Sequence, residues 1–214
     1  MARGDGGAGG DVFGGWGVMD RDEHGRTRTD TDGQEPVAAG SWIWTIGGRR
    51  FELASPTAEM VNVGEIGHAL ARLCRFVGHI RPQMYSVAQH CLEVSQRCPT
   101  GMEGWGLMHD AAEAYVGDIS GPLKALVPAV CEVEERILGV IAGVVGLEMP
   151  VPEEVKVVDR RMLLTEMREF RSARQAAVLA EAWGLEPYES GLITWQAGLA
   201  RALWMERFRE VVQR

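Results

Sequence analysis

From residue 57 to residue 212, apolar residues recur at helical spacing in one segment after another, and this repetition constrains the fold most strongly. The segments with this spacing are 63–74, 87–98, 103–116, 129–145, 153–171, 173–184 and 192–212. Asn62, which precedes Glu65 by three residues, and Ser86 are typical helix N-caps. Prolines at positions 122, 128, 150 and 152 separate the later segments. We therefore predict an all-α bundle of six or seven helices.

A short aromatic segment precedes the helices. Residues 42–53, WIWTIGGRRFEL, have the pattern of a β-hairpin, because Gly47-Gly48 can supply the positive φ angles of a type I′ turn. In that register Trp44 faces Phe51 and Trp42 faces Leu53. We expect this aromatic side of the hairpin to pack on the helical body or on a second subunit.

Residues 1–40 differ in composition from the rest of the chain. They contain 11 of the 27 glycines, and 4 arginines stand against 8 acidic residues. Such a segment cannot bury enough apolar surface to offset the entropy of ordering it. We expect a disordered or loosely ordered leader over 1–40, with Met19 as an alternative start, and a single domain over 41–214.

Charge and cysteine content exclude several classes of function. The 22 basic and 30 acidic residues give a net charge of -8, which disfavours binding to a nucleic-acid polymer. No run of 18 apolar residues is present, so we expect no membrane span. The four cysteines form no CxxC pair, and the N-terminus lacks the apolar core of a signal peptide. We therefore expect a cytoplasmic protein with free thiols.

Four residues are candidates for a metal site because each interrupts an apolar helical segment. They are His90 in SVAQHCLEV, the pair His109-Asp110 in WGLMHDAAEAYVGD, and Asp159 in VKVVDRRMLL. A buried charged aspartate costs several kcal/mol unless it is paired or coordinated. Two imidazoles and two carboxylates that meet in a bundle core would suit a divalent transition metal such as Mn, Fe, Co, Ni or Zn. The alternative is that these are ordinary core residues with satisfied hydrogen bonds.

Two further carboxylates strengthen the metal hypothesis. Glu113 follows His109 by four residues and Asp110 by three, so it lies on the same helical face. Asp118 comes just after the predicted helix. A solvated acidic helix end is the alternative, but the apolar residues between these carboxylates make the segment look buried.

The segment HDAAEAYVGDISGPLK, residues 109–124, resembles the HD-x-x-E-x-x-x-G-D-x-x-x-P-x-K segment of the YfbR-like 5′-deoxynucleotidases, a group of HD-domain metal-dependent phosphohydrolases. Arg75-Phe76 and the run from Tyr85 to His90 are similar to the Arg-aromatic and Val-x-x-His pattern of the same group. The resemblance covers roughly residues 41–171. It departs at Phe76, where the deoxynucleotidases have Trp, and in the leader, which has no counterpart in that group.

The resemblance implies a role for each matching residue. His90, His109, Asp110 and Asp159 would ligate one divalent transition metal per subunit, with Mg²⁺ as a further ion if the substrate is a triphosphate. Glu113 would orient or deprotonate the attacking water, and Asp118 would contact the sugar 3′-OH or assist the leaving 5′-oxygen. Arg75 and Lys124 would hold phosphate oxygens, Phe76 would line the sugar or base pocket, and His79 would contact substrate at the mouth of the site.

The same resemblance implies a phosphohydrolase of deoxyribonucleotides. The favoured reaction is that of the related phage enzymes, dATP plus water giving deoxyadenosine plus triphosphate, in the host cytoplasm if the gene belongs to a phage. One alternative is a 5′-deoxynucleotidase that releases phosphate from deoxynucleoside monophosphates. Others are a cyclic-nucleotide phosphodiesterase and a regulatory module that only binds nucleotides. We expect a small-molecule deoxynucleotide and further copies of the chain, in a homo-oligomer, as partners.

Overall fold

The computed structural model describes residues 40–82, 84–189 and 191–213, and these form an all-α fold with a small antiparallel hairpin. The predicted leader lies outside the described residues, apart from Gly40. The elements in chain order are β1 (Trp42–Trp44), β2 (Arg50–Glu52), the 3₁₀ helix η1 (Ala58–Met60), α1 (Val63–Leu70), the 3₁₀ helix η2 (Arg75–Gly78), α2 (Val87–Arg97), α3 (Glu103–Met108), α4 (Glu113–Val116), α5 (Gly121–Leu126), α6 (Ala129–Val145), α7 (Glu153–Phe170), α8 (Ala173–Trp183) and α9 (Ala197–Val211).

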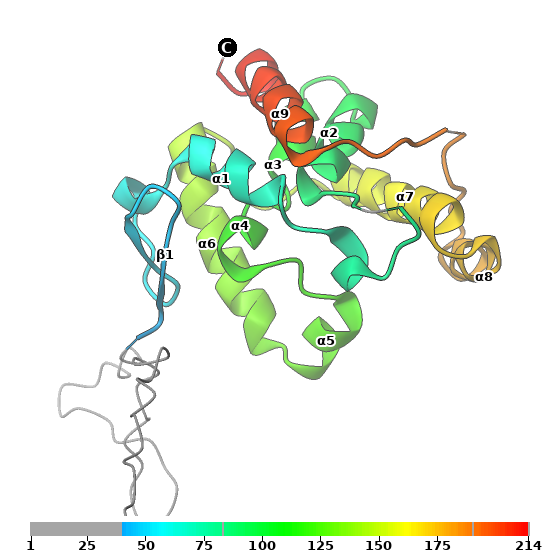
Figure 1. Ribbon diagram of the computed structural model, residues 1–214, viewed down its shortest axis with the longest axis horizontal. Helices are drawn as coiled ribbons and strands as arrows, with labels where there is room; N and C mark the ends of the chain where they lie inside the picture. Colours follow the sequence, from blue (N-terminus) through cyan, green and yellow to red (C-terminus); the bar gives the residue numbers. More distant parts are fainter. Residues whose placement is uncertain (1–39, 83, 190, 214) are drawn as a thin grey trace, which may run out of the picture.

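Helix α2 lies at the centre of the bundle and packs against α3, α7 and α9 (Figure 1). Its first two turns are almost entirely buried, from Val87 to Leu92. The apolar core around it draws on nearly every long helix, with Leu107 from α3, Ile141 from α6, Met162 from α7 and Trp204 from α9 completely buried. The polar residues Gln89, His90 and Ser95 of α2 are therefore completely buried.

The helix boundaries predicted from caps and spacing are largely confirmed. The side-chain oxygen of Asn62 accepts a hydrogen bond from the Glu65 amide at 3.0 Å, and the Ser86 hydroxyl accepts one from the Gln89 amide at 3.2 Å. The predicted segment 129–145 coincides with α6. Helix α9 begins at Ala197, five residues later than predicted, since residues 191–196 run in an extended connection along α2.

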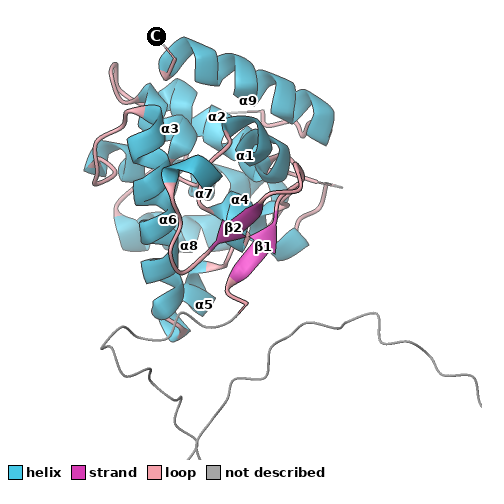
Figure 2. Ribbon diagram, turned by 90° about the vertical axis from the view of Figure 1, so that its left-hand side faces the viewer, coloured by secondary structure: helices cyan, strands magenta, loops and turns pink. Residues whose placement is uncertain are grey.

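The hairpin is present, but its predicted register is wrong by one residue. Trp42 pairs with Glu52 and Ile43 pairs with Phe51 (Figure 2). A type I′ turn needs two positive φ angles, and in this loop only Gly48 has one, at 71°. The Gly48 amide donates to the Thr45 carbonyl at 2.9 Å, so the loop is a three-residue turn closed by a left-handed glycine.

As a result of this register, Phe51 rather than a tryptophan anchors the hairpin to the helical body. Phe51 is completely buried and stacks on Tyr115 with ring centroids 3.6 Å apart. Trp44 projects outward and is 64% exposed. The hairpin thus packs on α4, the short helix that follows the His109-Asp110 pair.

The predicted helix 103–116 is divided into α3 and α4 by tight turns over residues 109–112. Amides in this stretch bond three residues back, as the Glu113 amide does to the Asp110 carbonyl at 3.0 Å. Helix α3 also approaches α2 very closely at Gly106, where an added Cβ would lie 2.8 Å from Ser95 Cα and 2.6 Å from Cys98 Sγ. This close approach explains a glycine inside a helix and brings His109 toward His90.

Gly106→Ala is expected to destabilise the fold by about 1–3 kcal/mol, because the new methyl group overlaps the α2 backbone and the two helices must separate. Helix propensity alone would favour alanine by about 1 kcal/mol, so the expected sign is opposite to the local preference. Gly143→Ala in α6 is the matched control, since an added Cβ there meets nothing within 4 Å. Urea unfolding of both variants measures the difference, and equal stabilisation by both would contradict the close packing.

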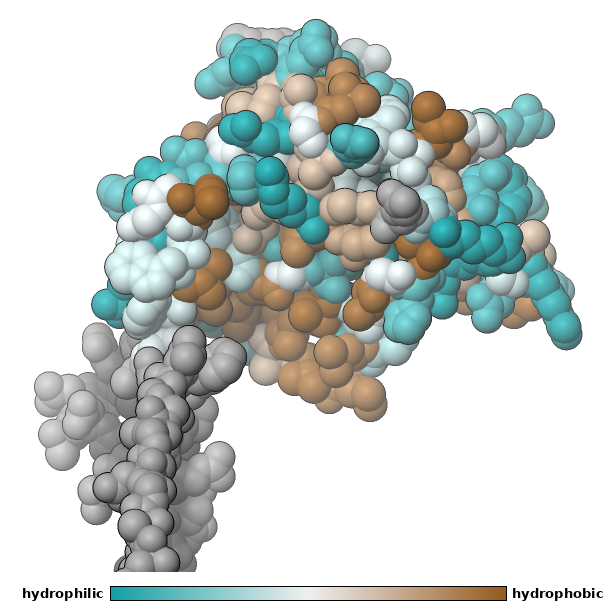
Figure 3. Space-filling view, viewed as in Figure 1, coloured by the Kyte–Doolittle hydropathy of each residue, from teal (hydrophilic) through white to brown (hydrophobic). Residues whose placement is uncertain are grey.

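Exposed apolar side chains gather on α5 and the residue after it. Leu123, Leu126 and Val127 are 45%, 80% and 44% exposed, and they contribute to the brown area at the lower edge of the molecule in Figure 3. No helix in the described part of the chain is both long and apolar enough to cross a membrane.

Candidate metal centre

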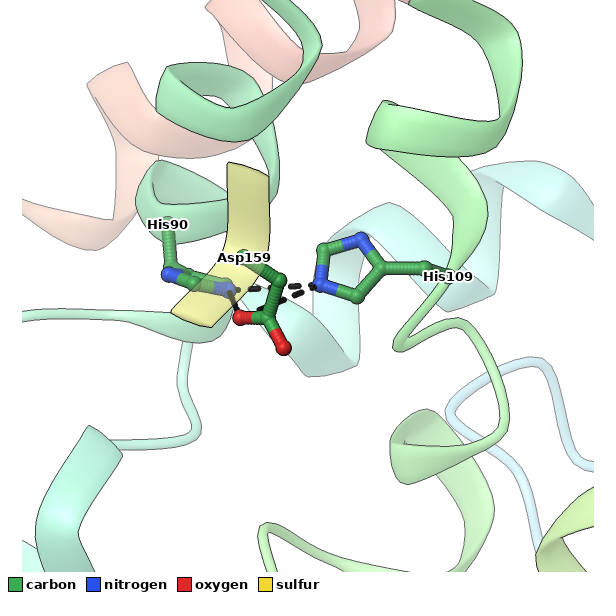
Figure 4. A group of neighbouring side chains, drawn as sticks. All are labelled: His90, His109 and Asp159. Atoms are coloured by element: carbon green, nitrogen blue, oxygen red, sulfur yellow. Dashed lines mark hydrogen bonds and ion pairs between the residues drawn. The ribbon is translucent and has the colours of Figure 1, made fainter. Parts of the chain in front are cut away.

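The four predicted ligands come from three helices that meet around the middle of the bundle. His90 lies in α2 and is completely buried. His109 follows the last residue of α3, with Asp110 directly after it, and Asp159 lies in the second turn of α7. Figure 4 shows His90 and His109 facing each other, with the Asp159 carboxylate between them. The structure therefore brings together residues that are up to 69 positions apart in the sequence.

The potential ligand atoms lie close to one another. His90 Nε2 is 3.3 Å from His109 Nε2, 3.1 Å from Asp159 Oδ1 and 3.6 Å from Asp110 Oδ2. His109 Nε2 is 3.4 Å from Asp110 Oδ2 and 3.8 Å from Asp159 Oδ1. Each carboxylate thus approaches both imidazoles through a single oxygen.

The Nδ1 atom of each imidazole makes a hydrogen bond that determines which ring nitrogen carries the proton. His109 Nδ1 donates to the Gly106 carbonyl at 2.9 Å. His90 Nδ1 lies 2.5 Å from Glu166 Oε1 and donates to that carboxylate. In the neutral rings both Nε2 atoms then carry lone pairs, and these point at each other and at two carboxylate oxygens.

This arrangement fits a bound divalent cation. Ligands about 2.0–2.2 Å from a common ion are separated by about 3.0 Å at right angles and about 3.4 Å at tetrahedral angles. Three of the five separations, 3.1, 3.3 and 3.4 Å, match these values, and the other two are 3.6 and 3.8 Å. Hydrogen bonds from the remote nitrogen to a carboxylate or a carbonyl are also typical of metal-binding histidines. The donor set of two nitrogens and two oxygens suits a transition metal.

The pKa of His90 reflects the negative charge that surrounds its ring. Burial and the nearby charge of Arg75 both oppose protonation of the ring. Attraction from Glu166, with hydrogen bonds to Asp159 and Glu166, outweighs them and raises the pKa of His90 to about 10. The carboxylates around His90 therefore favour a positive charge at this position.

Glu166 was not predicted as a site residue, and it has a central place in the structure. It is completely buried on α7, seven residues after Asp159. Besides His90 it accepts hydrogen bonds from Tyr85 Oη and Arg75 Nε, both at 3.0 Å. The sequence signal that could have revealed it is the seven-residue spacing, which puts both carboxylates on one face of the helix.

Arg75 is brought to the centre, but its visible partners are carboxylates of the site itself. Its Nε bonds to Glu166, and its Nη1 lies 3.5 Å from Asp110 Oδ2. Burial disfavours its charge, and the surrounding carboxylates, Glu166 first, keep the pKa of Arg75 well above its usual value. The predicted contact with phosphate stays a prediction.

Glu113 lines a cavity together with two of the candidate ligands, His109 and Asp110. This cavity has a volume of about 310 Å³, and its lining combines ligands with charged and apolar residues: His109, Asp110, Ala112, Glu113, Lys124, Cys131, Glu134, Glu135, Leu138, Met149, Pro150, Val151 and Lys156. Glu113 Oε2 is buried and has no hydrogen-bond partner among the described residues. Burial, together with the charges of Asp110 and Asp118, raises the pKa of Glu113 to about 10. A cation at the centre would oppose this rise.

Lys124 is the predicted phosphate ligand that does line the cavity. Its Nζ is 3.9 Å from Glu113 Oε1 and 2.9 Å from Glu134 Oε2. The lining does not include the other predicted substrate residues Arg75, Phe76 and His79, nor Asp118. Asp118 interacts electrostatically with Arg75, Asp110, His90 and Lys124, so it lies near the centre.

Phe76 occupies a strained turn next to Arg75. Phe76 and Val77 have φ angles of 58° and 55°, which are unusual for non-glycine residues and especially for a β-branched one. Such conformations cost of order 1–3 kcal/mol each and concentrate at functional sites. The Arg75 and Arg171 guanidinium groups lie 5.7 Å and 5.2 Å from the Phe76 ring centroid. His79, at the end of this turn, is exposed.

Cys91 is close enough to His109 and Asp110 to be considered as a ligand. It is completely buried in the apolar core, and burial raises the pKa of its thiol well above the usual value. A thiol must lose its proton to bind a metal, so Cys91 is better interpreted as a core residue than as a ligand.

No known protein-family profile matches the chain. Two proteins of uncharacterized function are similar to it in sequence. The uncharacterized protein YfdR of Escherichia coli K12 is 35% identical over 172 residues, which cover 80% of this chain and 96% of YfdR. An uncharacterized protein of Rhodobacter capsulatus is 32% identical over 125 residues, which cover 54% of this chain and 64% of that protein. At that identity and coverage, the chain belongs to the same family as YfdR.

Proposed function

We propose that this protein is a metal-dependent phosphohydrolase of the HD type and that its substrate is a deoxyribonucleotide. The observation that carries the proposal is the convergence of two imidazole nitrogens 3.3 Å apart with two carboxylate oxygens, each 3.1–3.8 Å from both nitrogens. Two of these four residues, His109 and Asp110, line a cavity that Glu113 and Lys124 also line. The resemblance of residues 109–124 to deoxynucleotidases supplies the substrate class.

A divalent ion held by His90, His109, Asp110 and Asp159 would acidify water and neutralise charge on a phosphoryl group. The protein's own contribution is then to move a proton and to position the phosphate. Glu113 Oε2 borders the cavity without a partner, which makes it the acceptor for a proton from the attacking water. In the reaction the oxygen of that water bonds to the α-phosphorus, the bond from phosphorus to the 5′-oxygen breaks, and the 5′-oxygen takes a proton.

Cations next to the centre would stabilise the substrate's negative charge. Lys124 lines the cavity and is shared between Glu113 and Glu134, so it can turn to a phosphate oxygen without moving far. Arg75 also adjoins the centre, with its guanidinium held by Glu166 and Asp110. Both cations would stabilise the charge of a phosphoryl group placed at the metal.

The resemblance alone favours dATP as the substrate, with release of triphosphate. The charges that line the cavity favour instead the second candidate, a 5′-deoxynucleotidase. Glu134 and Glu135 line the cavity beyond Lys124, and their charges would repel the β- and γ-phosphates of a triphosphate there. A monophosphate would leave that part of the cavity to the nucleoside.

The deciding assay incubates the protein with Co²⁺ or Mn²⁺ and, separately, each deoxynucleoside triphosphate and monophosphate, with the products separated by anion-exchange chromatography. Triphosphate from dATP establishes the favoured reaction. Inorganic phosphate from monophosphates alone establishes the deoxynucleotidase. Stoichiometric metal without turnover of any of these substrates contradicts both reactions and favours a nucleotide-binding module. Cyclic AMP is included as a further substrate, to test for a phosphodiesterase.

Metal binding is expected to stabilise the fold, because the centre joins α2, α3 and α7 and is incomplete in the unfolded chain. At a free metal concentration 100 times the dissociation constant, the free energy of unfolding should rise by about 2.7 kcal/mol. Thermal unfolding with added Mn²⁺ or Co²⁺, and again with excess chelator, measures the effect. Ca²⁺ serves as the control ion, because it prefers oxygen ligands and should shift the transition much less.

A further inference from the structure

Glu166 is a fully buried carboxylate that no sequence motif assigned to the site. It lies on α7 two turns after Asp159, with completely buried Met162 on the same face between them. One helix thus presents two carboxylates to the same imidazole ring: Asp159 Oδ1 approaches His90 Nε2 at 3.1 Å, and Glu166 Oε1 approaches His90 Nδ1 at 2.5 Å.

Every contact of Glu166 is with a hydrogen-bond donor. Its Oε1 accepts from His90 Nδ1 and from Tyr85 Oη, and its Oε2 accepts from Arg75 Nε. Three donors on two oxygens suit an ionised carboxylate, which has acceptors only. An unpaired buried charge would be costly, and Arg75 offsets that cost as the direct counter-ion.

These contacts restrict the His90 ring in two ways. A carboxylate at Nδ1 requires a proton on that nitrogen, which leaves Nε2 as the atom available for a metal. The short bond also fixes the rotation of the ring about its side-chain torsions, so that Nε2 points at His109 Nε2 and Asp159 Oδ1. Partners of this kind orient a metal-binding histidine and raise its basicity.

We propose that Glu166 is a positioning residue that holds His90 in the tautomer and ring orientation required to bind the metal; the inference rests on the metal centre of the proposed function. Glu166 is then a part of the centre that contacts neither the ion nor the substrate. His109 has a neutral counterpart of this arrangement, in which the Gly106 carbonyl accepts from Nδ1. The two histidines therefore differ in how strongly the protein polarises them.

Glu166→Gln tests the proposal with almost no change in shape. A carboxamide has one oxygen and one NH₂ group, so its NH₂ faces either Arg75 Nε or both His90 Nδ1 and Tyr85 Oη, and at least one of the three donors loses its acceptor. Binding of Co²⁺ and Zn²⁺ is measured by competition with a chromophoric chelator, and we expect the affinity to fall about 10–100-fold. Tyr85→Phe is the matched control, because it removes one hydrogen bond from Oε1 and leaves the carboxylate in place. It should lower the affinity far less.

A second measurement needs no variant and therefore does not depend on the folding of Glu166→Gln. In the Zn²⁺-loaded wild-type protein, labelled with ¹⁵N at histidine, the His90 ring should show a protonated Nδ1 with a downfield proton and a metal-bound Nε2. A metal-bound Nδ1, an unprotonated Nδ1, or wild-type metal affinity in folded Glu166→Gln would each overturn the positioning role. Equal losses in Glu166→Gln and Tyr85→Phe would also overturn it. A wild-type protein that binds no metal would overturn the proposed function as well.

Discussion

Replacing His109 with alanine is expected to abolish metal binding and hydrolysis together. The substitution removes one of the two imidazole nitrogens of the centre, which lies 3.3 Å from His90 Nε2. Metal content in the purified protein should fall from about one ion per chain to less than about one tenth. Turnover should fall by more than about a thousandfold, because a bound ion moves the pKa of water from 15.7 to about 7.

Metal content by plasma emission spectroscopy and turnover of the best substrate are measured on the same samples. His68→Ala is the control, since His68 is a half-buried histidine of α1 that borders a different small cavity and should leave both quantities unchanged. Asp110→Asn, which preserves volume, repeats the test at a second ligand and guards against unfolding of the alanine variant. Full metal content in both ligand variants would show that the ion binds elsewhere.

The elements of the fold could be predicted from the sequence because their signals are local. Asn62 and Ser86 make the cap hydrogen bonds expected of them, and the proline-bounded segment 129–145 is a helix over that whole range. The hairpin register could not be predicted, because it depends on whether Gly47 as well as Gly48 takes a positive φ angle. Both choices are allowed locally, and burial of Phe51 against Tyr115 goes with the observed one.

The candidate ligands could also be predicted, because each is a charged or titratable residue in an apolar helix. Their mutual distances could not, since these follow from the close approach of α3 to α2 at Gly106. From the sequence alone, Gly106 only lowers the helix propensity of its segment. The structure shows why a glycine is needed there, because a larger side chain would collide with α2.

Glu166 shows where sequence reasoning fails for a physical reason. In a helix that also carries Arg160 and Arg161, a glutamate at this position looks like an ordinary surface ion-pair partner. In the structure Arg160 pairs with Glu153, and Arg161 bonds to the Glu186 carbonyl and lies over the Tyr188 ring. The cation that pairs with Glu166 is Arg75, 91 residues away. Only tertiary packing selects that partner.

Glu113→Gln is expected to keep the metal and lose catalysis. None of the recorded contacts of Glu113 joins it to the two imidazole nitrogens, and its nearest cation is Lys124 at 3.9 Å, so the four ligands should still bind an ion. An amide cannot accept a proton from water, and loss of a general base costs typically about 10²–10⁴-fold in rate. In this variant, measured as for His109→Ala, the metal content should therefore stay at the wild-type value while the turnover falls.

The comparison of these two quantities separates three roles for Glu113. Loss of metal together with turnover would make Glu113 a ligand, and unchanged turnover would place proton transfer on another group. Glu132→Gln, an exposed residue of α6 outside the cavity lining, controls for the change in net charge. Burial and the charges of Asp110 and Asp118 raise the pKa of Glu113 to about 10, and a cation at the centre would lower it toward the range of a general base. The glutamine variant keeps all four candidate ligands and removes only this proton acceptor, which is why metal content and turnover should respond differently.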